Sequence, residues 1–196
     1  MIRIIDFVSS LFGLILLLPV FLVIAVWIKL DDRKGSVFYK QIRVGKNGID
    51  FGLYKFRSMY ADSEKYGLIT IGGRDQRITQ SGYYIRKYKL DELPQLINVL
   101  KGEMSMVGPR PEVRKYVDLY TDEQRRVLTV RPGITDYASI EYLDENTLLA
   151  QSDDPDKTYI EEIMPAKIRL NMKYINNPSL SEYLKIIFKT ITAIIC

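Results

Sequence analysis

Adjacent carboxylates and a proline-bounded arginine make the segment 89–112 the part of this chain best suited to chemistry. Asp91 and Glu92 stand together at the predicted start of a short helix, LPQLINVL, which Gly102 is expected to end. Arg110 follows in the turn Gly-Pro-Arg-Pro, where a proline on each side restricts the backbone. Two acids, a helix N-terminus and a rigidly held cation suit chemistry on a phosphate group with the help of a metal ion.

The same acidic pair also has a purely structural interpretation. Aspartate is a preferred N-cap residue. Pro94 would be tolerated in the first turn of a helix, because the N–H that proline lacks has no partner there. The Asp-Glu-Leu-Pro sequence taken alone therefore indicates a helix start, and the chemical interpretation depends on the rest of the chain.

The absence of histidine excludes several classes of active site. The 196 residues contain no histidine, and the single cysteine is Cys196. A Ser-His-Asp triad, a Cys-His pair, a disulfide framework and a thiolate zinc site are all excluded. Any catalysis must use carboxylate, lysine, arginine, tyrosine or hydroxyl groups, and any metal held by such oxygen ligands is expected to be Mg²⁺ or a similar hard cation.

The charge balance restricts the partners. The chain has 28 Lys and Arg against 24 Asp and Glu, a net charge of +4. A basic chain can bind nucleic acid, anionic lipid or a phosphorylated substrate. No zinc-finger spacing or RNA-binding aromatic motif occurs, so we expect no nucleic-acid partner.

An uncharged apolar run over residues 7–28 predicts a membrane element. A straight helix of that length rises about 33 Å, enough to cross a bilayer core. Pro19 interrupts the run and is expected to bend it, with Ser9 and Ser10 satisfying backbone groups freed near the bend. These features fit a spanning helix and a re-entrant helix equally well. Cations flank the run on both sides, which favours two cytoplasmic ends: Arg3, Lys29, Arg33 and Lys34.

Two short strands are predicted over residues 36–58, with a turn at Gly-Lys-Asn-Gly between them. The alternation in the second strand places Lys55 and Arg57 on one face. That face is either a solvated cationic surface or part of a phosphate site.

The remaining pattern predicts a compact, helix-rich α/β or α+β domain with a small strand element. A helix over 80–88 would carry Arg86 toward the acidic pair. The helix near the C-terminus is too short and too charged to span a membrane, so it should pack on the domain or lie in the interface. Helices are expected over 80–88, 121–128, 165–175 and 182–195, and loops or turns over 60–78, 131–135 and 144–157.

Several motifs together resemble the bacterial sugar transferases, the monotopic phosphoglycosyl transferases that start glycan assembly on polyprenyl phosphate. LDELPQL, NVLKGEMS and VGPRP are similar to the core signature of that family, and YKFRSM and RPGIT follow its other motifs. All occur in the family's order after an apolar N-terminal segment, so the resemblance covers nearly the whole chain.

The resemblance implies a two-step reaction. Asp91 matches the nucleophile that attacks the β-phosphorus of a UDP-sugar, forms a phosphosugar acyl-phosphate and releases UMP. Polyprenyl phosphate then attacks this intermediate and leaves as the polyprenyl-diphosphate sugar. Glu92 matches the Mg²⁺ ligand, and we include Asp91 in the metal site. The cations implied to bind substrate phosphate are Arg110, Lys55, Arg57, Arg86 and Arg131.

The resemblance also implies an organisation. Residues 1–30 would form a kinked re-entrant membrane helix broken at Pro19, and residues 31–196 a cytoplasmic catalytic domain, as a minimal catalytic form of the family. The protein would lie at the cytoplasmic face of the bacterial inner membrane. Anionic lipid and downstream glycosyltransferases would be further partners.

One loop departs from the family pattern, because RPGIT is followed by Asp136-Tyr137-Ala138 where the family often has Gly-Trp-Ala. No sugar or nucleotide contact is therefore carried over from this loop. We expect an N-acetylated amino sugar as the donor's sugar, with glucose or galactose as the alternative. A non-catalytic, membrane-tethered lipid-binding or scaffold module is the alternative from another class, but only the enzyme needs Asp91, Glu92 and Arg110 together.

Overall fold

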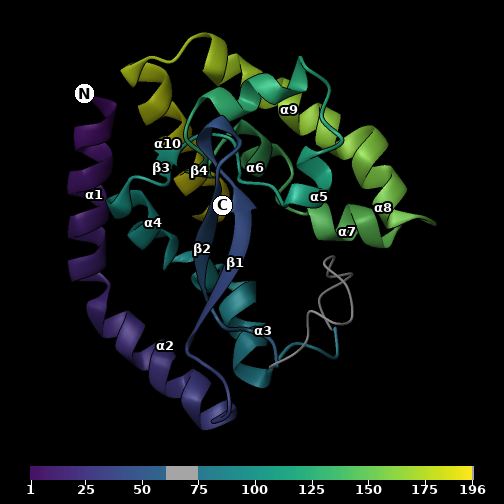
Figure 1. Cartoon of the computed structure of the whole chain (residues 1–196). Helices are drawn as coiled ribbons and strands as arrows, with labels where there is room; N and C mark the ends of the chain where they lie inside the picture. Colours follow the sequence, from purple (N-terminus) through teal and green to yellow (C-terminus); the bar gives the residue numbers. More distant parts are fainter. Residues whose placement is uncertain (61–74, 196) are drawn as a thin grey trace.

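The computed structural model describes residues 1–60 and 75–195 (Figure 1). Most of the loop predicted over 60–78 lies outside these residues. Helices dominate the described part, and two small sheets lie among them. The predicted helix-rich domain with a small strand element is therefore confirmed.

The chain begins with two helices, α1 (Ile2–Leu16) and α2 (Leu18–Asp31), bent by 59° at Leu17. Pro19 lies in the first turn of α2, where its missing N–H needs no partner. Continuing α1 straight through this position would bring the proline ring against the carbonyl of the preceding turn, so the predicted bend occurs beside the proline. In the described part of the chain no single helix is long and apolar enough to cross a membrane, although the bent pair together has the length and composition.

The role predicted for the two serines of α1 is wrong. The Ser9 hydroxyl donates to the carbonyl of Ile5 at 2.6 Å, and the Ser10 hydroxyl donates to the carbonyl of Phe7 at 3.1 Å. Serine inside a helix commonly bonds to the carbonyl of the turn before it. Both hydroxyls therefore act away from the bend.

Polar contacts hold the first turns of α1 against the rest of the protein. The Arg3 guanidinium donates to the carbonyls of Val99 at 2.6 Å and Leu100 at 3.0 Å, at the end of α4 (Gln95–Lys101). The buried Asp6 carboxylate accepts hydrogen bonds from the Ser105 hydroxyl, the Met106 N–H and the Tyr183 hydroxyl. Figure 1 shows α1 running beside α4.

The predicted pair of strands is present as β1 (Phe38–Val44) and β2 (Asp50–Phe56), an antiparallel ribbon. The helical turn η1 (Lys46–Gly48) joins them. Asn47 and Gly48 both have positive φ, at 58° and 75°. Asparagine and glycine adopt this conformation most readily, which explains why Asn-Gly occupies the turn.

A second sheet was missed. Strands β3 (Ser105–Val107) and β4 (Gly133–Thr135) pair in parallel, so residues 131–135 are not simply a turn as predicted. Strands of three residues are too short to show an alternating pattern. The pairing depends on close backbone approach, because a Cβ on Gly133 would lie 2.1 Å from the Gly108 nitrogen.

The predicted helices over 80–88, 165–175 and 182–195 are confirmed as α3 (Gln80–Lys87), α9 (Met164–Asn176) and α10 (Leu180–Ile195). The loop predicted over 144–157 is wrong. It contains α7 (Glu145–Ala150) and α8 (Pro155–Thr158), and the Asp154 side chain caps α8. Here acidic residues begin short helices, which their composition alone did not distinguish from a loop.

The remaining elements are α5 (Arg114–Val117), α6 (Tyr137–Glu141), the 3₁₀ turns η3 (Leu90–Glu92) and η4 (Gln124–Thr129), and the π-helical η5 (Tyr159–Ile163). The capping box predicted at Thr121 is present, since Thr121 and Gln124 exchange side chain-to-backbone hydrogen bonds. The helix after it is 3₁₀ rather than α.

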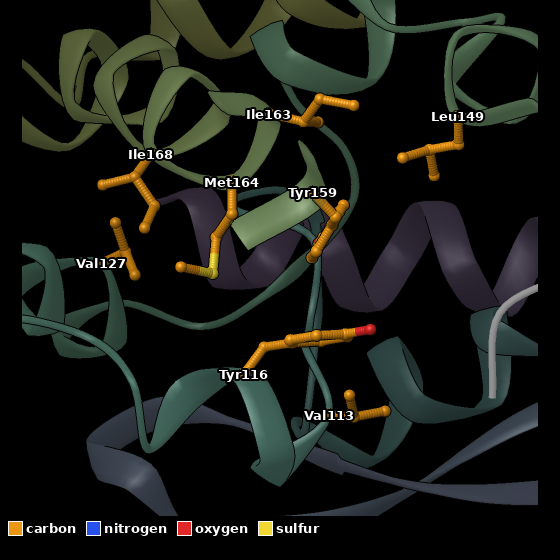
Figure 2. Packing of buried hydrophobic residues seen from close by; sticks show 8 residues of the cluster. All are labelled: Val113, Tyr116, Val127, Leu149, Tyr159, Ile163, Met164 and Ile168. Carbon is orange, nitrogen blue, oxygen red and sulfur yellow. The ribbon is translucent and has the colours of Figure 1, made fainter. Parts of the chain in front are cut away.

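The largest buried cluster lies where η5 and α9 pack on α5 (Figure 2). The rings of Tyr116 and Tyr159 pack against each other at its centre, tilted by 54° with their centroids 4.8 Å apart. On the other side of the domain, Tyr183 and Ile186 of α10 pack against Ile2 of α1. The C-terminal helix therefore packs on the domain, as one of the two alternatives predicted.

Candidate active site

The acidic pair lies in η3, a separate 3₁₀ turn before α4, rather than in the first turn of α4 as predicted. Pro94 is the N-cap residue of α4, and no side chain caps that helix. Asp91 makes no side-chain hydrogen bond or ion pair with any residue that the structure describes. The N-cap interpretation of Asp91 is therefore wrong, and its carboxylate is available for another role.

Glu92 is the point at which three segments meet. The Arg110 guanidinium donates to both carboxylate oxygens of Glu92, with a distance of 3.0 Å from Nη1 to Oε2. The Lys55 Nζ, from β2, lies 3.4 Å from Oε1. A planar guanidinium matches a carboxylate in this two-point arrangement. The structure thus brings Asp91, Glu92, Lys55 and Arg110 together, from segments up to 55 residues apart in the sequence.

The two acids differ in their electrostatics. Burial raises the pKa of Asp91, which is only 7% exposed, and the Glu92 charge adds to this while Lys55, Arg86 and Arg110 oppose it. Burial alone would also raise the pKa of Glu92, but the charges of Arg110 and Lys55 hold that pKa well below its usual range. Two adjacent carboxyl groups with opposite pKa directions are a common sign of separate chemical roles.

Burial and the Glu92 charge also shift the pKa values of the cations. Burial lowers the pKa of Lys55, with the Glu92 charge opposing, whereas the Glu92 charge raises the pKa of Arg110. Arg86, from the last turn of α3, acts on Asp91 through its charge. These three cations offset the negative charge of the pair and would attract a phosphate group.

Two of the predicted cations are used elsewhere. Strand β2 ends at Phe56, and the Arg57 guanidinium turns toward α2, where Nη1 lies 2.7 Å from the Asp32 carboxylate. Arg131 donates from Nε to the Gly102 carbonyl at 2.9 Å and so satisfies the end of α4. Neither residue reaches the acidic pair, so placing them in a phosphate site is a prediction that the contacts do not support.

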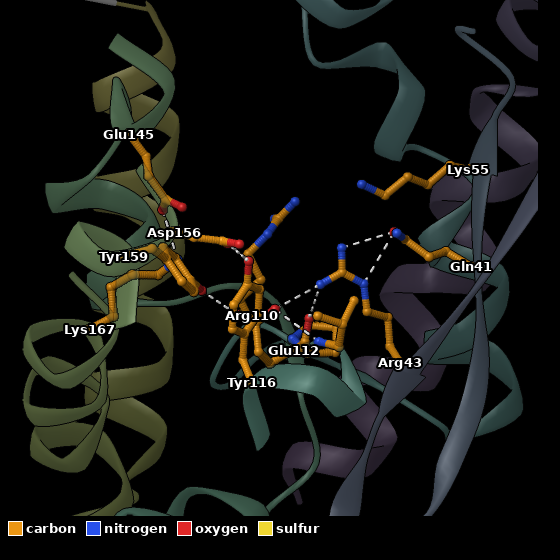
Figure 3. A network of polar contacts seen from close by, with 12 residues as sticks. Gln41, Arg43, Lys55, Arg110, Glu112, Tyr116, Glu145, Asp156, Tyr159 and Lys167 are labelled. Atoms are coloured by element: carbon orange, nitrogen blue, oxygen red, sulfur yellow. Dashed lines mark hydrogen bonds and ion pairs between the residues drawn. The ribbon is translucent and has the colours of Figure 1, made fainter. Parts of the chain in front are cut away.

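Arg43 was missed by the sequence analysis. It donates to the Gln41 side chain, to the Pro111 carbonyl at 3.2 Å and to the Glu112 carboxylate at 3.1 Å (Figure 3). The register that pairs Tyr39 with Lys55 puts Arg43 on the same face of the ribbon as Lys55. The alternation Tyr-Lys-Gln-Ile-Arg along β1 places Arg43 on the same strand face as Tyr39. That face can be matched to Lys55 only once the strand register is known.

Glu112 extends the network away from the acidic pair. It accepts from the Arg43 guanidinium, from the Val113 N–H and from the Tyr159 hydroxyl. Burial raises the pKa of Tyr159, and the Glu112 charge adds to it. A ribbon strand, the segment after Arg110 and the π-helical turn η5 are therefore joined through one carboxylate (Figure 3).

The carboxylates present fit a hard cation only in part. Among the described residues, no group of three or more Asp, Glu, His or Cys side chains could hold a metal by itself. Mg²⁺ often uses one or two carboxylates and completes its shell with water and substrate phosphates. Asp91 and Glu92 supply oxygen ligands of that kind, but Glu92 would share its oxygens with Arg110 and Lys55.

Comparison with known proteins identifies the family of this chain. The sequence profile of the bacterial sugar transferase family matches residues 1–196. The chain is 40% identical, over 97% of its length, to the UDP-N-acetylgalactosamine-undecaprenyl-phosphate N-acetylgalactosaminephosphotransferase of Aeromonas hydrophila, and spans 42% of that protein. It is 36% identical over 96% of its length to the UDP-glucose:undecaprenyl-phosphate glucose-1-phosphate transferase of Klebsiella pneumoniae, spanning 39% of it. It is 34% identical over 96% of its length to the exopolysaccharide production protein ExoY of Rhizobium meliloti, spanning 83% of it.

Proposed function

Because this chain belongs to the bacterial sugar transferase family, we propose that it transfers a sugar-1-phosphate from a UDP-sugar to polyprenyl phosphate. The observation that carries the proposal is the buried Asp91 carboxylate, which has no partner among the described residues and stands beside the Glu92–Arg110–Lys55 cluster. A lipid-binding or scaffold module would have no use for a buried, unpaired carboxylate, which is costly to keep charged. We therefore favour the enzyme over the non-catalytic alternative.

The proposed chemistry uses Asp91 as the nucleophile. A carboxylate oxygen of Asp91 attacks the β-phosphorus of the UDP-sugar, and the bond from that phosphorus to the oxygen bridging the two phosphates breaks. UMP leaves with the bridging oxygen and the electron pair. An oxygen of polyprenyl phosphate then attacks the same phosphorus, and the Asp91 carboxylate leaves. Lys55, Arg86 and Arg110 offset the repulsion between the carboxylate and the diphosphate in the first step, and between polyprenyl phosphate and the acyl-phosphate in the second.

The sugar is proposed from the relatives. The Aeromonas hydrophila relative is named for N-acetylgalactosamine and the Klebsiella pneumoniae relative for glucose. We propose an N-acetylated amino sugar, with a plain hexose as the alternative. The test measures UMP release across a panel of UDP-sugars with undecaprenyl phosphate and Mg²⁺. UMP release with none of these donors would reject the proposed function, and release with UDP-glucose or UDP-galactose alone would select the alternative.

Magnesium is proposed as the cofactor, held by Glu92 and Asp91 together with substrate phosphates. When bound, it would neutralise charge on the diphosphate. We expect activity to vanish in EDTA and to return with Mg²⁺. In Glu92→Gln, the Mg²⁺ concentration giving half-maximal activity should rise by about tenfold or more, because one negative ligand is lost. Undiminished activity in EDTA would rule out the metal role.

We propose that α1 and α2 form a re-entrant membrane element with both ends on the cytoplasmic side. The contacts of Arg3 with the end of α4, and of Asp6 with Ser105, support this. They hold the N-terminus against the domain that carries the acidic pair, which would place both on one side of the membrane. Many apolar side chains on the two helices are exposed, among them Phe12, Ile15, Leu22 and Val23.

Cysteine labelling in spheroplasts tests this topology. A single cysteine replaces Ile2 in a Cys196→Ser background, and a membrane-impermeant maleimide is added from outside. We expect no labelling until the membrane is permeabilised. Pro19→Leu should raise outside labelling, because an unbroken apolar helix is long enough to span. Adding Asp6→Ala should raise it further by releasing α1 from β3 and α10. Outside labelling of the protein with Pro19 intact would show a spanning anchor instead.

A further inference from the structure

We infer that Asp136 is a positioning residue for Arg110, fixing the backbone of the arginine turn and tying it to α9. The Asp136 carboxylate is 3% exposed and lies directly after β4. One of its oxygens accepts from the Arg110 N–H at 2.9 Å and from the Asn171 amide at 2.8 Å. Its other oxygen accepts from the Ser139 N–H and so caps α6.

The sequence of the arginine turn shows why this contact matters. Pro109 and Pro111 have no backbone N–H, so Arg110 provides the single backbone donor between Gly108 and Glu112. Asp136 accepts that donor. Without the carboxylate, the Arg110 N–H would lose its partner on the side where it faces the buried Asp136, and leaving a backbone donor unpaired away from water is costly.

Two further contacts hold the carbonyls on either side. The Pro109 carbonyl accepts from the Gly133 N–H at 3.0 Å, and the Pro111 carbonyl accepts from Arg43 at 3.2 Å. The turn is therefore seated between β4 and β1, and Asp136 fixes its centre. The guanidinium of Arg110 binds both oxygens of Glu92, so a displacement of this backbone would also displace the guanidinium from the acidic pair.

The charge of Asp136 adds to its geometric role. The Glu92 charge is the main cause of the raised pKa of Arg110, and the Asp136 charge contributes to it. A glycine or alanine at this position could provide neither the acceptor oxygen nor the charge. Asp136 therefore holds the arginine turn by a hydrogen bond and adds a negative charge beside it.

Amide exchange of Arg110 tests the inference independently of activity. With ¹⁵N-arginine labelling, the Arg110 signal is identified by its loss in Arg110→Lys. We expect a slowly exchanging amide in the native protein and exchange about tenfold faster or more in Asp136→Ala and Asp136→Gly. Asp154→Ala is the matched control, because it removes the aspartate that caps α8 and should leave the Arg110 amide unchanged. An Arg110 amide that exchanges equally slowly in Asp136→Ala would overturn the inference.

A double-mutant cycle supplies the kinetic test, which rests on the proposed function. Asp136→Ala should lower kcat/KM by about tenfold or more, with Asp136→Asn falling between it and the native protein. In an Arg110→Ala background the same change should cost less than about twofold, because its effect acts through the arginine. Equal losses in both backgrounds would show a general structural role and defeat the inference. Failure of the native protein with every UDP-sugar would reject the proposed function instead, and leave the exchange result to decide the role of Asp136.

Discussion

Asp91→Asn is expected to abolish UMP release while leaving the fold and the membrane association intact. Asparagine has nearly the same shape as aspartate but cannot form an acyl-phosphate. The chain has no histidine and a single cysteine, Cys196, so no such side chain stands near Asp91 in the sequence to act as the nucleophile instead. Loss of a nucleophile commonly costs more than about 10³-fold in turnover. If the Asp91→Asn protein kept more than about a tenth of the native rate, Asp91 could not be the nucleophile.

The covalent step can be observed directly. With UDP-sugar and no lipid acceptor, the native protein should gain the mass of one phosphosugar on the peptide that contains Asp91. Asp91→Asn should gain none. Asp118→Asn is the matched control, because that carboxylate is 61% exposed and pairs with Arg114 rather than with a cation of the acidic pair. It should react as the native protein does.

The Asp91→Asn substitution should not reduce the stability of the folded protein at neutral pH. Burial raises the pKa of Asp91, so its charged form destabilises the folded state above that pKa. This cost disappears as the pH falls through the raised pKa toward the ordinary value of about 3.9. The Asp91→Asn protein should therefore melt at or above the native temperature at pH 7, and the difference should shrink on acidification. Thermal unfolding followed at several pH values checks both points.

Local signals in the sequence predicted those parts of the fold that local interactions decide. Asn47-Gly48 marked the ribbon turn, and Gly102, with φ of 87°, ended α4 as expected. The strands β3 and β4 could not be predicted, because three residues carry no periodicity. What joins them is the close approach of Gly108 and Gly133, which are distant in the sequence.

The candidate site likewise contains residues that motifs predicted and residues that only tertiary packing reveals. The motif residues Asp91, Glu92 and Arg110 do meet, but motif membership did not separate Lys55 from Arg57. That separation depends on where β2 ends, and therefore on packing against α2. The sequence analysis assigned no role to Asp6, which only precedes an apolar run. Its burial against β3 and α10 is visible only in the tertiary structure.

Arg110→Ala is expected to lower kcat/KM by about 10²- to 10³-fold, as the loss of one preorganised charged donor does in other active sites. The alanine leaves Glu92 with Lys55, at 3.4 Å, as its remaining ion-pair partner among the described residues. Arg110→Lys should recover part of the loss, since it keeps the charge but not the two-point fit to the carboxylate. Arg114→Ala is the matched control four residues away, because its guanidinium is 43% exposed and pairs with the exposed Asp50. It should leave turnover unchanged.

The pH profile shows whether Arg110 acts through the acidic pair. The Arg110 charge lowers the pKa of both Asp91 and Glu92, against the effect of burial. Its removal should therefore move the acid limb of kcat/KM to higher pH, so that the loss in Arg110→Ala is greater at pH 6 than at pH 8. A loss that is the same at both pH values would mean that Arg110 contributes by binding substrate phosphate alone. In that case the two-point contact with Glu92 would have no part in keeping the nucleophile charged.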